Sequence, residues 1–200
     1  MIAENFYLEF MQATQLDIPG VFVLTPPRFG DARGWFSIPY NDAAFAEATG
    51  LTPAFLQDNH AYSQAMGTLR GLHFQKPPHA QGKLVRCVRG RIRDVAVDIR
   101  EGSPTFGRHV FADLDADEGR QIFVPRGFAH GYVTLCDDCE VEYKVDGPYA
   151  RDAEGGLLWS DPALGIDWGL DPTVISANDR DAGFPRLADM PPAFRFGDAA

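Results

Sequence analysis

His73 is the side chain whose type and surroundings point most directly to proton transfer. It lies in the segment Leu69-Arg70-Gly71-Leu72-His73-Phe74-Gln75, and an imidazole can take up or release a proton near neutral pH. Neighbouring side chains of a strand point to opposite faces, so His73 should point away from Leu72 and Phe74. A lone histidine is more often structural than catalytic, so the groups around it decide its role.

Lys83 and Tyr143 are the side chains that could complete a proton-transfer reaction with His73. Removing a proton beside a ketone requires a base, together with a cation or donor that stabilises the developing enolate oxygen. Inverting the carbon then requires an acid on the opposite face. Histidine suits the first role, lysine the second and tyrosine the third, so these residues favour an epimerase.

Four arginines are candidates for binding a diphosphate, because guanidinium groups match phosphate oxygens: Arg33, Arg70, Arg86 and Arg89. For Arg86 and Arg89 we favour the alternative of a solvated strand face. Tyr149, which follows a proline, could stack on a nucleobase or simply fill the barrel, and the sequence leaves both open.

His130 ends the segment Pro125-Arg126-Gly127-Phe128-Ala129-His130, which has the Pro-x-Gly-x-x-His spacing of metal-binding cupin barrels. Such sites also need a His-x-His pair and a carboxylate on an earlier strand, where this chain offers His73 alone. We therefore predict no metal site. Two interpretations of His130 stay open: a turn histidine bonded to the backbone, or a substrate ligand at the barrel mouth.

Composition limits the classes of partner and compartment. A chain of 200 residues with a net charge of −10 fits one domain and argues against nucleic acid or an anionic membrane as a partner. No apolar run approaches the roughly 20 residues of a membrane span, and the N-terminus does not resemble a secretory signal. Three cysteines, two of them in Cys136-Asp137-Asp138-Cys139 without a second such pair, indicate free thiols in the cytoplasm.

Short β-type runs separated by turn residues dominate the chain, and one helix is expected from Ala43 to Ala48, with Asn41 or Asp42 as its cap and Gly50 as its stop. This pattern predicts an all-β jelly-roll barrel of one domain, 1–200, with a few short peripheral helices. Residues 1–19 would form an N-terminal arm and 150–200 a C-terminal region of loops and short helices. The expected strands are Val21–Leu24, Gly34–Pro39, Ala54–Asp58, Gly67–Phe74, Leu84–Val88, Arg91–Ile99, Arg108–Leu114, Gln121–Val124, Gly131–Leu135 and Glu140–Val145.

From about Gly20 to about Asp179 the chain resembles the dTDP-4-dehydrorhamnose 3,5-epimerase family. Each matching block alone would be weak, but their order and spacing together make chance similarity very improbable. The blocks include Phe29–Phe36, Gln57–His60, Leu69–Gln75, Gln81–Arg86, Asp94–Arg100, Ser103–Gly107, Pro125–Gly131, Glu142–Lys144 and Trp159–Pro162.

The resemblance implies a homodimeric cupin-type barrel that needs neither cofactor nor metal and acts on a dTDP-linked 4-keto-6-deoxy sugar. By this resemblance, His73 would abstract the C3 and C5 protons, Asp179 would pair with it, Lys83 would stabilise the C4 enolate and Tyr143 would return a proton. Tyr149 would stack on the thymine. The remaining substrate-binding positions would be Arg33, Gln57, Asp58, Asn59, Arg70, His130, Glu154 and Asn178.

Two positions depart from the family pattern: Ile38 replaces a usual glutamate and Asn178 a usual lysine. Both belong to the substrate-contacting set, so the nucleotide or sugar could differ, and a single-carbon epimerase is the alternative within this class. A non-catalytic sugar-binding barrel would be marked by loss of His73, Lys83 or Tyr143, all of which are present. A metal-dependent cupin is disfavoured because the His-x-His pair is absent.

Overall fold

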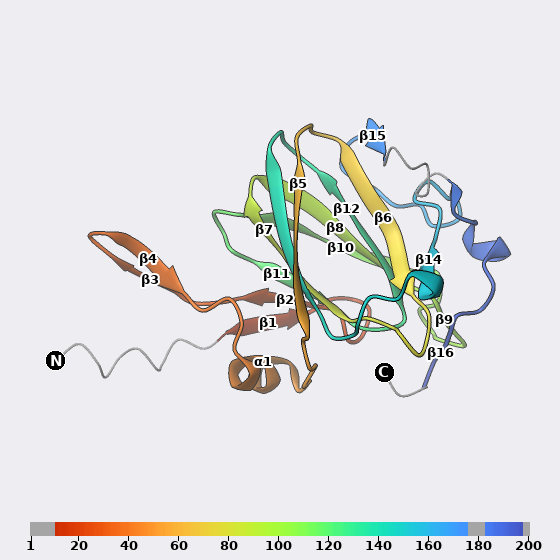
Figure 1. The fold of residues 1–200 in the computed structure, drawn as a ribbon, viewed down its shortest axis with the longest axis horizontal. Helices are drawn as coiled ribbons and strands as arrows, with labels where there is room; N and C mark the ends of the chain where they lie inside the picture. The colour runs from red at the N-terminus through yellow and green to blue at the C-terminus, as the bar shows by residue number, and fades with distance from the viewer. Residues whose placement is uncertain (1–10, 176–182, 198–200) are drawn as a thin grey trace.

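The computed structural model describes residues 11–175 and 183–197, and its main feature is two β-sheets that face each other (Figure 1). The first sheet has the strand order β1-β2-β11-β7-β13-β5. Its strands are β1 Gln12–Gln15, β2 Phe22–Thr25, β5 Gln57–Ser63, β7 Lys83–Arg89, β11 Gln121–Val124 and β13 Cys139–Val145.

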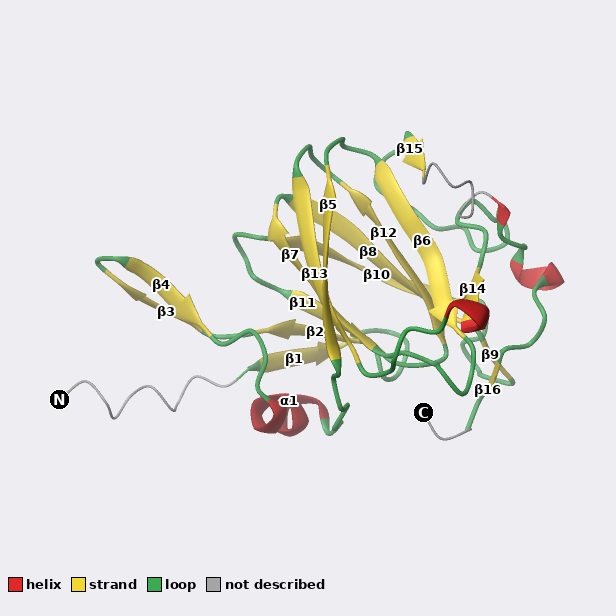
Figure 2. Cartoon of the chain, in the orientation of Figure 1, coloured by secondary structure: helices red, strands yellow, loops and turns green. Residues whose placement is uncertain are grey.

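The second sheet has the order β10-β8-β12-β6-β14, and β15 pairs with β6 in parallel. Its strands are β6 Thr68–Gln75, β8 Arg91–Asp98, β10 His109–Asp115, β12 Phe128–Thr134, β14 Glu154–Gly156 and β15 Val174–Ile175. Two small sheets pair β3 Arg28–Asp31 with β4 Gly34–Ser37, and β9 Arg100–Glu101 with β16 Phe194–Arg195. The short 3-10 helices are Arg151–Ala153 and Leu187–Asp189. Figure 2 shows how strongly strands dominate, which confirms the all-β jelly-roll prediction.

Helix α1, Asp42–Thr49, forms where the sequence predicted it. The Asn41 side chain caps it by accepting a hydrogen bond from the Ala44 backbone N–H, and Gly50 ends it with a φ of 74°. Its one buried residue, Phe45, packs against Leu24 and Phe123 on the outer face of the first sheet. The cap and the stop therefore confirm both boundary residues.

Apolar side chains fill the space between the sheets and also cover the outer face of the second sheet. Val85, Ile92 and Ile122 belong to the central core. Leu72 and Phe74 of β6 belong to the outer cluster, where Leu157 and Trp168 of the C-terminal region cover them. His73 therefore points to the inner side of β6, as predicted from alternation.

The N-terminal boundary differs from the predicted arm of residues 1–19. Gln12–Gln15 pair with β2 as the edge strand of the first sheet, because Met11 and Leu24 bury apolar side chains against α1. Residues 1–10 lie outside the described part of the chain. By contrast, the β3–β4 hairpin projects from the barrel (Figure 1).

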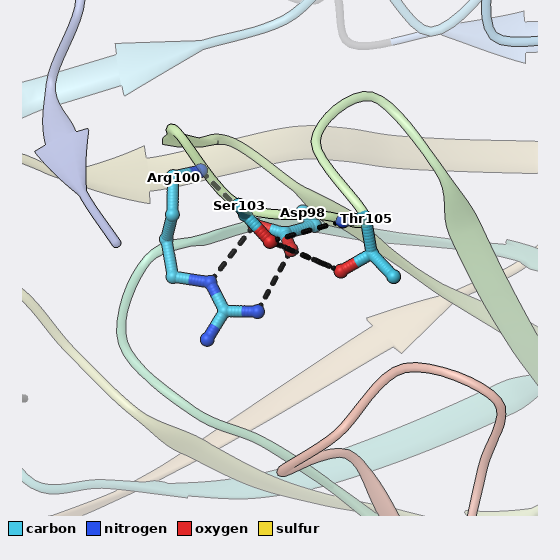
Figure 3. A network of polar contacts seen from close by, with 4 residues as sticks. All are labelled: Asp98, Arg100, Ser103 and Thr105. Atoms are coloured by element: carbon cyan, nitrogen blue, oxygen red, sulfur yellow. Dashed lines mark hydrogen bonds and ion pairs between the residues drawn. The ribbon is translucent and has the colours of Figure 1, made fainter. Parts of the chain in front are cut away.

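Asp94 and Asp98 alternate along one face of β8, and their carboxylates lie in different environments. Asp94 binds the His130 ring on the neighbouring strand β12, whereas Asp98 binds the loop that follows its own strand. The Asp98 carboxylate accepts hydrogen bonds from the Arg100 guanidinium at 2.7 Å and from the Ser103 and Thr105 hydroxyls at 2.6 Å each (Figure 3). Burial tends to raise the pKa of Asp98, but these hydrogen bonds outweigh it and lower the pKa.

Replacing Asp98 by Asn should lower the free energy of unfolding at pH 7 by about 2–3 kcal/mol, because the half-buried Arg100 guanidinium loses its charged partner. The folded-state pKa lies below the unfolded one, so this stabilisation is lost as the pH falls through the folded value. Measured by urea unfolding, the difference in unfolding free energy between the parent and Asp98→Asn should be smaller near pH 3 than at pH 7. Asp117→Asn on the exposed β10–β11 turn is the control, and an equal loss there would contradict the role of Asp98.

Candidate active site

A cavity of about 690 Å³ opens between the two sheets, large enough for a nucleotide-sized ligand. Side chains from β5, β7 and β13 of the first sheet line one side, and side chains from β6 and β12 of the second line the other. Of the predicted site residues, the cavity gathers Gln57, Asn59, Arg70, His73, Lys83, His130, Tyr143, Tyr149 and Glu154. Residues up to 97 positions apart in the sequence thus meet in one place.

His73 lies on β6 opposite His130 of β12 in the strand register. The strands approach closely beside this pair: a Cβ at Gly71 would lie 2.5 Å from the Gly131 Cα, so the packing requires glycine. The edge of Phe184 meets the His73 ring at 5.7 Å between centroids. The imidazole is therefore half-buried, with an apolar wall on one side and the cavity on the other.

Lys83, at the start of β7, lies in the same cavity. Burial lowers the pKa of its ammonium group to about 8, although the Asp94 carboxylate acts to raise it. A lysine of this kind is cationic at neutral pH and poorly solvated, so it can stabilise a negative charge that develops beside it.

His130 is held by Asp94, whose carboxylate oxygens both lie 2.9 Å from the histidine Nε2. Burial lowers the pKa of His130, and the neighbouring charges of Lys83 and His73 lower it further, against the opposing effect of Asp94. His130 bonds to a carboxylate, so the expectation of a backbone-bonded turn histidine does not describe it. Its place in the cavity lining fits the substrate-ligand interpretation.

Tyr143 reaches the cavity from β13, on the sheet that faces the strand of His73. Burial raises the pKa of its phenol, and the Arg70 guanidinium acts in the opposite direction. The phenol therefore keeps its proton at neutral pH, while Arg70 would stabilise the phenolate left after proton donation. Arg70 itself donates hydrogen bonds to the Ser63 hydroxyl at 3.3 Å and the Tyr62 carbonyl at 3.0 Å.

Two predicted substrate-binding residues lie away from this cavity. Asp58 points to the opposite face of β5, where it forms an ion pair with Lys144 at 2.7 Å. Strand alternation explains this, since its neighbours Gln57 and Asn59 both line the cavity. Arg33 lies at the tip of the β3–β4 hairpin, paired with Asp31, and its side chain is 90% exposed.

Asn178 and Asp179 lie outside the described residues, so the pairing of Asp179 with His73 remains a prediction. Ile38 follows β4 and is exposed. Arg86 and Arg89 are on the outer face of the first sheet, paired with Glu142 and Glu140 respectively, which confirms the solvated-face interpretation.

Several site residues were not expected from the sequence: Gln75, Gln81, Tyr132 and Phe184 line the cavity, and Asp94 binds His130. The alternation of acids in β8 was the one available signal for Asp94. Phe184 lies in the Gly- and Pro-rich tail, where no periodic pattern indicates which side chains return to the barrel.

No helix within residues 11–175 and 183–197 is long and apolar enough to cross a membrane. Within the same ranges, no three His, Cys, Asp or Glu side chains are arranged to hold a metal ion.

The arrangement can remove and return a proton on opposite faces of one bound ring. The His73 imidazole on β6, the Tyr143 phenol on β13 and the Lys83 ammonium group on β7 line the same volume. Because His73 and Tyr143 approach from facing sheets, a carbon deprotonated by one can be reprotonated by the other with inversion.

Comparisons with known proteins agree with this geometry. The family model for dTDP-4-dehydrorhamnose 3,5-epimerase matches residues 15–189. A dTDP-4-dehydrorhamnose 3,5-epimerase from Sinorhizobium fredii is 44% identical over 94% of this chain and 96% of its own length.

Solved structures agree as well. A Legionella pneumophila dTDP-6-deoxy-D-glucose-3,5-epimerase, in complex with dTDP-4-keto-L-rhamnose, superposes with a TM-score of 0.87 at 38% identity, over 93% of this chain and 98% of that one. A double mutant of a 3′-monoepimerase from Streptomyces bikiniensis, in complex with dTDP, gives a TM-score of 0.80 at 34% identity, over 87% and 86%.

These matches span most of the chain and of each relative, and they confirm the resemblance seen in the sequence. The chain therefore belongs to the dTDP-4-dehydrorhamnose 3,5-epimerase family, whose members are isomerases that act on dTDP-sugars.

Proposed function

We propose that this protein converts dTDP-4-dehydro-6-deoxy-D-glucose to dTDP-4-dehydro-L-rhamnose by inverting C3 and C5 beside the C4 ketone. The observation that carries the proposal is the convergence of His73, Lys83 and Tyr143 on one cavity from three strands in two facing sheets. The product is the ligand that the Legionella relative is described as binding.

In the proposed mechanism, His73 takes the proton from C3, and the electrons of the C–H bond move toward the C4 oxygen to give an enolate. Lys83 stabilises this oxygen with its ammonium group. Tyr143 then donates its proton to C3 from the other face, and the carbonyl re-forms. Proton exchange with solvent then returns His73 to its neutral form and gives the Tyr143 phenolate back its proton, and the same cycle at C5 completes the reaction. Asp179 would orient His73 and support its charge while it holds the substrate proton.

The Streptomyces monoepimerase provides support for this pair of residues. In its double mutant a histidine and a tyrosine seventy positions apart are both replaced. His73 and Tyr143 have the same separation in this chain. The match supports the assignment of base and acid without deciding how many carbons are inverted.

Product analysis over a panel of nucleotide 4-keto-6-deoxy sugars tests the function. We expect the dTDP-sugar to be the preferred substrate, with NMR coupling constants of the product showing inversion at both C3 and C5. Turnover of another nucleotide at a higher kcat/KM would contradict the substrate assignment, and would direct attention to Ile38 and Asn178.

Single-carbon epimerisation is the second candidate, favoured by the similarity to the Streptomyces 3′-monoepimerase. The two candidates share the base, the enolate and the acid, so they differ only in whether C5 is also inverted. Product stereochemistry at C5 separates them directly.

Replacing Tyr143 by Phe should uncouple proton exchange from inversion. His73 can still remove the substrate proton and return it from the same face, so exchange with solvent should continue within about tenfold of the parent rate. Inversion should fall by about 100-fold, since the opposite-face donor is lost. NMR in D₂O measures both rates in one sample, and an equal fall in the two rates would contradict the role of Tyr143.

We further propose a homodimer in which the β3–β4 hairpin of each subunit reaches the other's cavity. The hairpin projects from the barrel (Figure 1), and Trp35 and Phe36 are 62% and 55% exposed. Apolar side chains on a projecting element favour burial against a partner. Arg33 is exposed and does not line the cavity of its own subunit. In the proposed dimer its guanidinium would instead bind the diphosphate in the partner's cavity.

Co-expression of Arg33→Ala with His73→Ala chains tests this arrangement. A mixed dimer would hold one cavity with both residues intact, so random pairing should restore about a quarter of the parent kcat/KM at low substrate concentration. Each variant alone, measured at the same concentration, is the control. Absence of recovery in verified mixed dimers would contradict delivery of Arg33 across the interface.

The free thiols of Cys87, Cys136 and Cys139 support a reducing compartment, and we propose that the protein acts in the cytoplasm.

A further inference from the structure

We infer that Gln75 is a positioning residue that holds Tyr149 at the mouth of the cavity and thereby sets the affinity for the nucleotide. The inference rests on the proposed function, in that a nucleotide binds where Tyr149 is exposed. Tyr149 lines the cavity and is 60% exposed, so a loop segment alone would leave its ring with many orientations.

The Gln75 side chain binds the backbone on both sides of Tyr149. Its Oε1 accepts a hydrogen bond from the Ala150 N–H at 2.7 Å, and its Nε2 donates to the Pro148 carbonyl at 3.0 Å. The same Nε2 donates to the His79 carbonyl at 2.8 Å. One amide therefore uses its oxygen and both of its N–H groups to join three points of the main chain.

The position of Gln75 makes this attachment rigid. The residue is only 6% exposed, and it lies on β6 two positions after His73, on the same face of the strand. It pairs in register with Glu154, whose Oε1 accepts a hydrogen bond from the Tyr149 hydroxyl at 2.9 Å. Hydrogen bonds thus hold the backbone on both sides of Tyr149 to β6, the strand that carries His73. They also hold the Tyr149 hydroxyl to β14, which pairs with β6.

Loss of the Gln75 amide should loosen this segment without unfolding the barrel. Pro148 is exposed and Ala150 is half-buried, so water can satisfy the backbone groups that the amide leaves. We therefore expect the substitution to weaken nucleotide binding, because the segment must be ordered again when the nucleotide binds. A purely structural role would instead appear as lost stability with unchanged affinity.

Gln75→Met, which keeps the length of the side chain and removes its hydrogen bonds, tests the inference by titration with dTDP. We expect the Kd for dTDP and the KM for the sugar nucleotide to rise together by about tenfold, within the range of one base–aromatic stacking contact. The kcat should change less than about threefold. Thr134→Val is the matched control, because the Thr134 hydroxyl is a buried donor to the Ala65 carbonyl and does not line the cavity.

A double variant separates positioning of Tyr149 from a general effect. If Gln75 acts through Tyr149, adding Gln75→Met to Tyr149→Ala should weaken dTDP binding no further. Multiplying effects, or an unchanged Kd in Gln75→Met, would overturn the inference. Parent protein that binds dTDP but exchanges no substrate protons would instead refute the proposed function and leave the inference to be decided by the same titrations.

Discussion

His73→Ala should abolish proton exchange between substrate and solvent, with a fall in kcat of about 10³–10⁴-fold. His73 lines the cavity, whereas the Nε2 atom of His130, the other histidine of the lining, is bonded to the buried Asp94 carboxylate. Because its Nε2 is held by Asp94, we expect that His130 does not take over the role of His73. The expected measurement is the loss of substrate C–H signals in D₂O.

Binding of dTDP distinguishes a loss of catalysis in His73→Ala from a loss of folding, because only a folded variant binds the nucleotide. The Kd for dTDP should stay within about threefold of the parent, because the nucleotide contacts assigned here do not involve His73. His60→Ala is the matched control: His60 pairs with Glu140 at 3.0 Å on the outer face of the sheet, so its loss should leave exchange unchanged. Exchange at the parent rate in His73→Ala would show that the base has been assigned wrongly.

Lys83→Met should lower kcat by about 10²–10³-fold, because the enolate oxygen loses its cation. The same variant should unfold at a higher temperature than the parent. Burial holds the folded-state pKa of Lys83 near 8, below its ordinary value of 10.5, so the charged lysine destabilises the fold at neutral pH. That cost disappears as the pH rises from about 8 to 10.5.

The pH profile gives a second measurement on Lys83. Activity needs the ammonium form, so kcat/KM should fall as the pH rises through about 8. Asp94 supports that charge, and Asp94→Asn should move this alkaline limb to lower pH. Asp113→Asn, which removes an aspartate paired with Arg93 at 2.7 Å away from the cavity, should not move it. An unmoved limb in Asp94→Asn, or a limb that persists in Lys83→Met, would contradict the assignment.

The fold could be predicted wherever apolar alternation or end signals are local. All ten expected strands overlap observed ones, and α1 has both predicted boundary residues. The largest shift concerns β5, expected at Ala54–Asp58 and observed at Gln57–Ser63. One face of β5 lines a polar cavity and the other carries ion pairs, so the strand lacks the apolar alternation by which strands are identified.

Most of the predicted site residues line the cavity, but the contacts that set its chemistry could not be predicted. Spacing along β6 correctly placed His73 on the inner face. The Asp94–His130 pair joins two residues that are 36 positions apart, and the Gln75 amide binds a residue 75 positions away. A local sequence pattern cannot indicate contacts over such separations. The location of Arg33 on a projecting hairpin likewise depends on tertiary structure, and no pattern of residues within one chain indicates what its side chain contacts.

The most direct test of double epimerisation is incorporation of deuterium from D₂O into dTDP-4-dehydro-6-deoxy-D-glucose during turnover by the parent protein. Abstraction of a proton on each side of the C4 ketone predicts label at both C3 and C5, with inverted configuration at each. Label at C3 alone would contradict the double-epimerase assignment. If neither C3 nor C5 carried label, proton abstraction by His73 would be contradicted.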